Sequence, residues 1–136
     1  MTLLIFLGNK IAGEDAFGYI LYEKIKDKIK ERCEYLGTDL SKLYGIYRNE
    51  EKLIIIDAIY GIDDVVHIKN DEIWKIEDAS KGAHGLAPIE ILKILKIVMK
   101  KFPSEIHLIG LPAKNFKTIE NEDVIEKAIK KLMEIL

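Results

Sequence analysis

Short apolar runs alternate with amphipathic segments along this chain, and that alternation constrains its fold more than any other feature. Apolar runs typical of strands occupy residues 2–7, 33–37, 53–56 and 105–111. Apolar side chains recur every three or four positions, as in a helix, over residues 17–29, 88–102 and 125–136. Strands that alternate with helices form βαβ units. We therefore predict an α/β three-layer sandwich, in which helices cover both faces of a mixed, mostly parallel sheet of about five strands.

The fifth strand is predicted at residues 65–69. It follows a turn at residues 61–64, so we expect a hairpin in which it pairs antiparallel with the strand at 53–56. A single helical turn is expected at residues 40–44. No linker or internal repeat interrupts the pattern, so residues 1–136 are predicted to form one domain.

Composition narrows the classes of partner. The chain has 21 basic and 23 acidic residues and a formal net charge of -2, which gives no electrostatic reason to expect nucleic acid or an anionic membrane as a partner. The single cysteine, Cys33, has no internal disulfide partner, and the apolar N-terminal run is too short for a signal peptide or membrane span. We expect a cytoplasmic monomer. The abundance of Lys, Glu and Ile and the absence of Gln resemble a thermophile's composition.

In parallel sheets, ligands bind beyond the carboxyl ends of the strands. Three candidate residues fall there: Asp15, before the first helix; Asp57, after the strand at 53–56; and His84, in a Gly-flanked loop before the second long helix. Two carboxylates and an imidazole form a sound first shell for a divalent transition metal. The sequence therefore predicts a metal site at this edge.

Plainer interpretations of the two acids stay open. Glu14 and Asp15 suit the start of a helix, where acids complement the helix dipole, and Asp57 suits a turn cap. For His84 a ligand or acid–base role is favoured, because its loop offers little core to pack into. His67 and His107 fall inside predicted strands and are interpreted as structural.

Other chemistries lack their motifs. The glycines at 8 and 13 are too far apart for a dinucleotide fingerprint, and neither a phosphate-loop Lys-Ser/Thr pair nor a Gly-x-Ser-x-Gly elbow occurs. Cys33 has no histidine near it in the sequence and is interpreted as a small buried hydrophobe. Nucleotide binding and nucleophilic catalysis are therefore disfavoured.

Four motifs, in order, resemble those of the hydrogenase maturation proteases. They are Gly8-Asn9 followed after four residues by Glu14-Asp15-Ala16-Phe17-Gly18, then Ile54-Ile55-Ile56-Asp57-Ala58, then His84-Gly85-Leu86 leading to Glu90-Ile91-Leu92, and finally Gly110-Leu111-Pro112. Each motif alone is weakly specific, but the ordered set spans essentially the whole chain. The resemblance implies an endopeptidase that trims the large subunit of a nickel–iron hydrogenase.

The resemblance also assigns roles to the candidate residues. It implies that Asp15, Asp57 and His84 contact nickel already inserted in the precursor, or another divalent metal in its place. Glu14 adjoins Asp15, and the position within the motif favours Asp15 as the ligand. The implied reaction removes a short C-terminal extension, and whether Asp15 or Asp57 also acts as general base stays open. The alternative is a non-catalytic, chaperone-like module of the same fold that binds the hydrogenase precursor without cutting it.

Overall fold

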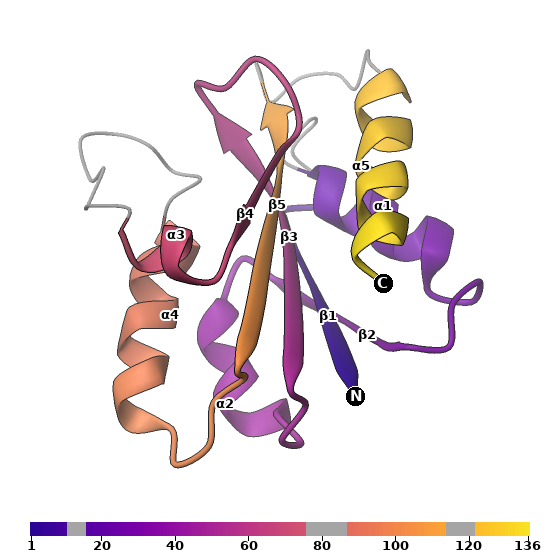
Figure 1. Cartoon of the computed structure of the whole chain (residues 1–136). Helices are drawn as coiled ribbons and strands as arrows, with labels where there is room; N and C mark the ends of the chain where they lie inside the picture. Colours follow the sequence, from indigo (N-terminus) through magenta and orange to yellow (C-terminus); the bar gives the residue numbers. More distant parts are fainter. Residues whose placement is uncertain (11–15, 76–86, 114–121) are drawn as a thin grey trace.

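The computed structural model describes residues 1–10, 16–75, 87–113 and 122–136 of the chain. Its centre is a five-stranded sheet with strand order β2-β1-β3-β5-β4 (Figure 1). The strands are β1 (Thr2–Leu7), β2 (Arg32–Gly37), β3 (Lys52–Tyr60), β4 (Val66–Lys69) and β5 (Glu105–Ala113). The first three and β5 run parallel, and β4 pairs antiparallel with β5. The predicted mixed, mostly parallel sheet is confirmed.

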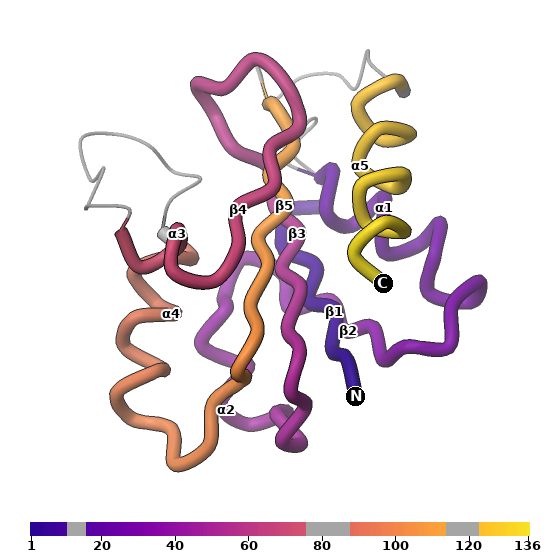
Figure 2. The backbone as a smooth tube through the Cα atoms, in the orientation of Figure 1, coloured from indigo at the N-terminus to yellow at the C-terminus, as the bar shows by residue number. Residues whose placement is uncertain are grey.

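Helices cover both faces of the sheet. On one face lie α1 (Phe17–Ile25) and α5 (Glu122–Ile135); on the other lie the 3₁₀ helix η2 (Leu40–Lys42), α2 (Leu43–Ile46), α3 (Asp71–Trp74) and α4 (Ala87–Val98). In Figure 2 the chain passes from α1 through β2 to the opposite layer and returns from α4 through β5 to α5. This is the predicted three-layer sandwich.

The central strands are apolar on both faces because each face is covered. Alternate residues of β1 and β3 enter different cores: Leu4 and Ile54 pack with α1 and α5, whereas Leu3 and Leu53 pack with α4 and α2. Continuous apolar runs, not an alternating pattern, therefore mark these strands in the sequence.

Two predicted strand ends were wrong. β3 does not end at Ile56 but continues to Tyr60, and β5 does not end before Pro112 but continues to Ala113. The extensions pair with each other, Ile59 opposite Pro112 and Tyr60 opposite Ala113. The pairing of β5 with β4 ends at Gly110, so Pro112 lies on a stretch with one strand neighbour, where a missing N–H is tolerated.

The predicted hairpin was also wrong. β4 is antiparallel, as expected, but its partner is β5, because β1 and β5 already occupy the two edges of β3. Helix α1 ends at Ile25, four residues before Ile29, and α4 ends at Val98. Val98 continues the apolar helical period of residues 88–102, yet it is 53% exposed, because the buried face of α4 is set by Ile89, Leu92 and Leu95.

Candidate functional site

Asp57 lies just beyond the point where the pairing of β1 with β3 ends. The last pairing of β1 with β3 joins Phe6 to Ile56, so Asp57 is the first residue of β3 beyond its β1 neighbour. On the other side it still pairs with Gly110 of β5. One neighbour of β1 is β2, and its other neighbour is β3, from which the sheet grows in the opposite direction. The switch point of the strand order therefore lies between β1 and β3. Ligands of open α/β sheets bind at such points.

The carboxylate of Asp57 is almost fully buried. The residue is 8% exposed, and its Oδ1 accepts a hydrogen bond of 2.8 Å from the backbone N–H of Ala58. Because strand residues alternate between faces, Asp57 shares the face of Leu53 and Ile55, which α4 covers. A buried carboxylate needs polar partners, and Asp57 has interactions beyond the one with Ala58. Asp57 is therefore a buried, hydrogen-bonded strand residue and not a turn cap on the surface.

Two glycines of the sequence motifs have steric reasons to be glycine. A Cβ on Gly18 would lie 1.8 Å from the carbonyl oxygen of Leu7, so only glycine lets α1 approach the end of β1 this closely. A Cβ on Gly110, directly opposite Asp57, would lie 2.3 Å from Cδ1 of Ile59. Gly18 meets the last residue of β1, and Gly110 pairs with Asp57 in β3, so both close contacts lie toward the carboxyl edge of the sheet.

The other two predicted ligands, Asp15 and His84, lie outside the described residues. Within residues 1–10, 16–75, 87–113 and 122–136, no three Asp, Glu, His or Cys side chains cluster as a metal shell. The predicted set of Asp15, Asp57 and His84 therefore stays a prediction, in which the position of Asp57 alone is described.

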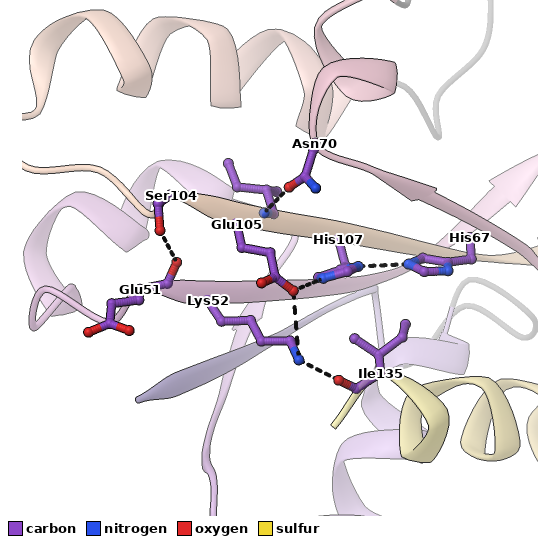
Figure 3. Close-up of polar contacts among 9 residues, drawn as sticks. Glu51, Lys52, His67, Asn70, Ser104, Glu105, His107 and Ile135 are labelled. Carbon is purple, nitrogen blue, oxygen red and sulfur yellow. Dashed lines mark hydrogen bonds and ion pairs between the residues drawn. The ribbon is translucent and has the colours of Figure 1, made fainter.

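A second polar cluster lies on the opposite face of the sheet, toward its amino edge (Figure 3). Nε2 of His67 lies 2.7 Å from Nδ1 of His107, and Nε2 of His107 lies 2.5 Å from Oε2 of Glu105. Nζ of Lys52 lies 3.7 Å from the same Glu105 oxygen and donates to the carbonyl of Ile135 near the end of α5. The chain of contacts ties β4, β5 and β3 to the C-terminal helix.

The contacts constrain which ring nitrogens donate and which accept in this cluster. Because the carboxylate of Glu105 only accepts, His107 donates from Nε2; when it is neutral its Nδ1 accepts, and His67 donates from Nε2. The hydrogen bond from His107 lowers the pKa of Glu105. Burial, followed by the charge of His107 and of Lys131, lowers the pKa of His67. The structural interpretation of both histidines fits these contacts.

Cys33 is half-buried. Burial raises the pKa of its thiol to about 11, so the reactive thiolate is suppressed at neutral pH. Its Sγ lies 3.6 Å from the carbonyl of Glu31, and the side chain packs against the core beneath α1. This matches the predicted role as a small hydrophobe.

Comparison with known proteins decides the family. The family model described as hydrogenase maturation protease (HycI) matches residues 21–136. The chain belongs to the hydrogenase maturation protease family. Protein FrxA of Pyrococcus furiosus is 31% identical over 129 residues, which cover 91% of this chain and 93% of that protein. The resemblance inferred from the ordered motifs is confirmed.

Solved structures agree with the fold of this family member. The [NiFe] hydrogenase maturation protease HybD from Thermococcus kodakarensis aligns with a TM-score of 0.80 and 26% identity, covering 98% of this chain and 97% of that one. The E. coli hydrogenase maturating endopeptidase HybD aligns with a TM-score of 0.75 and 22% identity, covering 99% and 91%. No helix in the described parts of the protease is long and apolar enough to cross a membrane.

The sequence did not reveal the histidine cluster of this protease. One signal was available: Glu105 and His107 are two residues apart in a predicted strand, so their side chains share a face. The contact between His107 and His67 depends on β4 pairing with β5, which the predicted hairpin excluded.

Proposed function

We propose that this protease removes a short C-terminal extension from the nickel-loaded precursor of a nickel–iron hydrogenase large subunit. The support is family membership together with one observation, the buried Asp57 carboxylate at the switch point of the sheet. The metal in this proposal arrives with the substrate. Asp57, with Asp15 and His84, recognises it and so restricts cleavage to precursors that already contain nickel.

The chemistry of these side chains suits that role. Carboxylate oxygens and an imidazole nitrogen bind divalent transition metals, and three such side chains leave coordination positions for other ligands. Burial of Asp57 keeps water away from its carboxylate, which strengthens its attraction for a cation. A precursor-borne metal held here polarises a nearby peptide carbonyl or activates a bound water for attack on it. The protein's contribution is to align the scissile bond with that ion.

Asp57→Asn tests the proposal with little disturbance of the fold. Asparagine has nearly the same shape, and its side-chain oxygen retains the acceptor that Ala58 N–H needs. We expect a folded protein whose processing of nickel-loaded precursor falls at least as far as the roughly 10–100-fold loss typical of altered metal surroundings. Asp63→Asn is the matched control, because Asp63 is exposed and lies six residues away.

Mass spectrometry of the precursor reads out the result. Loss of a short C-terminal peptide with wild type and Asp63→Asn, but not with Asp57→Asn, supports the proposal. Wild-type rates from Asp57→Asn would eliminate Asp57 as a metal contact. A precursor that binds the wild-type protein but keeps its full length would identify the non-catalytic binding module.

A further inference from the structure

Helix α4 carries an apolar surface that stays exposed among the residues that the structure describes. Its inner face is buried through Ile89, Leu92 and Leu95, which are at most 4% exposed. Its outer face shows the α4 stripe, defined as Ile94, Ile97 and Val98, which are 56%, 84% and 53% exposed. These positions follow helical spacing, so the three side chains form one continuous patch. Neighbouring exposed aliphatic side chains of this kind mark interaction sites.

Lysines border the α4 stripe. Along one side of the helix lie Lys93 and Lys96, and Lys100 and Lys101 follow its end. Lys93 pairs with Glu90 at 3.7 Å, and Nζ of Lys96 lies 4.3 Å from the ring centroid of Trp74. Lys100 and Lys101 are exposed and form no ion pair with any residue in the described ranges. Lys100 and Lys101 thus place positive charge beside the apolar surface.

The position of α4 relates this surface to the Asp57 edge. Helix α4 leads into the amino end of β5, so it runs antiparallel to the strands and begins at the carboxyl edge of the sheet (Figure 1). With a rise of 1.5 Å per residue, Ile94 lies about 10 Å and Val98 about 16 Å along the helix from its first residue. One protein interface of ordinary size, about 800 Å² per partner, spans that distance.

We propose that the α4 stripe and its lysine border form a docking surface for the hydrogenase precursor, on a region of it where apolar side chains are flanked by carboxylates. The inference rests on the proposed function, because it takes the precursor as the partner. Apolar contact supplies affinity, while the lysines select acidic surroundings and speed encounter. Docking here holds the precursor while its metal and C-terminus occupy the site at the other end of the helix.

Two other occupants fit the surface less well. A second copy of this chain, packed antiparallel, would place the lysine border against itself, and three side chains bury less area than a stable dimer requires. An anionic membrane usually calls for a cluster of four to eight basic residues. Of the four lysines here, Lys93 pairs with Glu90 and Lys96 lies over the ring of Trp74, which leaves Lys100 and Lys101. The combination of a narrow stripe and one-sided charge favours a protein surface.

Steady-state processing and equilibrium binding, measured with the full-length nickel-loaded precursor, test the inference. We expect Ile97→Asp to raise KM and the binding Kd roughly tenfold, as for loss of a central contact, with kcat unchanged. Lys100→Glu should raise KM several-fold at low salt, and the difference from wild type should shrink at about 0.5 M salt. Both positions are exposed, so the variants should fold normally.

Matched controls lie on α5, across the sheet. Met133→Asp changes another exposed apolar residue, 44% exposed, and Lys130→Glu reverses another exposed lysine. Wild-type KM and Kd for Ile97→Asp, or an equal effect from Met133→Asp, would overturn the docking surface. So would a wild-type dimer dissociated by Ile97→Asp, or binding of vesicles rich in anionic lipid that Ile97→Asp abolishes.

The binding measurement separates this inference from the proposed function. If wild type binds the precursor without trimming it, and Ile97→Asp weakens that binding, the docking surface stands and the protease assignment fails. If wild type trims the precursor and Ile97→Asp binds and trims equally well, the reverse holds. Absence of any binding by wild type contradicts both.

Discussion

Replacing Gly18 by alanine tests how tightly α1 is seated on the end of β1. The added Cβ would lie 1.8 Å from the carbonyl oxygen of Leu7 and 2.8 Å from its carbonyl carbon. Real Cβ atoms stay beyond 3.0 Å, so the helix must retreat by more than 1 Å. The obstacle is backbone at the end of a central strand, which has no rotamer to change.

The cost follows from what α1 buries. Phe17, Leu21 and Ile25 are at most 2% exposed, and a gap of 0.5–1 Å already forfeits a quarter to a half of each contact energy. Together with the strain of overpacking, we expect a loss of roughly 3–5 kcal/mol from the free energy of unfolding. A chain of this length has roughly 7–20 kcal/mol in total. The variant should fold, with a Tm lowered by roughly 10–20 °C.

The same substitution at two other glycines calibrates this value. A Cβ added to Gly45 in α2 would have nothing within 4 Å, so Gly45→Ala should stabilise the protein by about 0.5–1 kcal/mol. At Gly110 the nearest atom is Cδ1 of Ile59, the end of a flexible side chain, so Gly110→Ala should cost about 1–3 kcal/mol. Urea titration at 25 °C measures all three, and equal stabilities for Gly18→Ala and Gly45→Ala would refute the steric argument.

Two further predictions concern charge. Because the pKa of His67 is lowered, the folded state takes up a proton there at lower pH than the unfolded chain does. The free energy of unfolding is therefore highest above about pH 6.5 and falls as the pH is lowered, by at most about 1.4 kcal/mol per pH unit. His67→Gln retains a donor for His107 but does not titrate, so its stability should fall less steeply from pH 7 to 5; an identical slope would contradict this. Glu50 is 1% exposed and pairs with Arg32 at 2.9 Å, so Arg32→Ala should lower the free energy of unfolding by about 3–5 kcal/mol, as measured by urea titration. Loss of an exposed pair, such as Lys127 with Asp64, should lower it by less than about 1 kcal/mol.

Local sequence patterns predicted the layers of the fold, whereas the pairing of β4 and the buried face of α4 depended on contacts between distant segments. The apolar runs at residues 2–7 and 53–56 identified central strands, because a strand covered on both faces needs no polar residue. The partner of β4 depended on which sheet edge remained free after β1 and β5 had paired with β3. Val98 fits the helical period of the core but lies on the outer face, because the sheet contacts only the side of α4 that carries Ile89, Leu92 and Leu95.

For the candidate site, the sequence predicted the location of Asp57 but not its environment. An acid after an apolar run indicates a strand end, and Asp57 does lie at the carboxyl edge. That β3 and β5 continue beyond it while β1 stops depends on the register of three strands. Asp57 is 8% exposed, because it lies within a paired strand on the face of the sheet that α4 covers.

The unequal lengths of β1 and β3 thus determine the surroundings of the Asp57 carboxylate. Because β3 continues past Ile56, Asp57 is a strand residue and not a turn residue. Beyond Ile56, β3 keeps its pairing with β5 but not with β1, and the Asp57 carboxylate on this stretch is shielded from water. Helix α4 begins at the same carboxyl edge of the sheet and carries the α4 stripe outward from it. Helix α4 therefore connects the proposed docking surface with the edge of the sheet at which Asp57 lies.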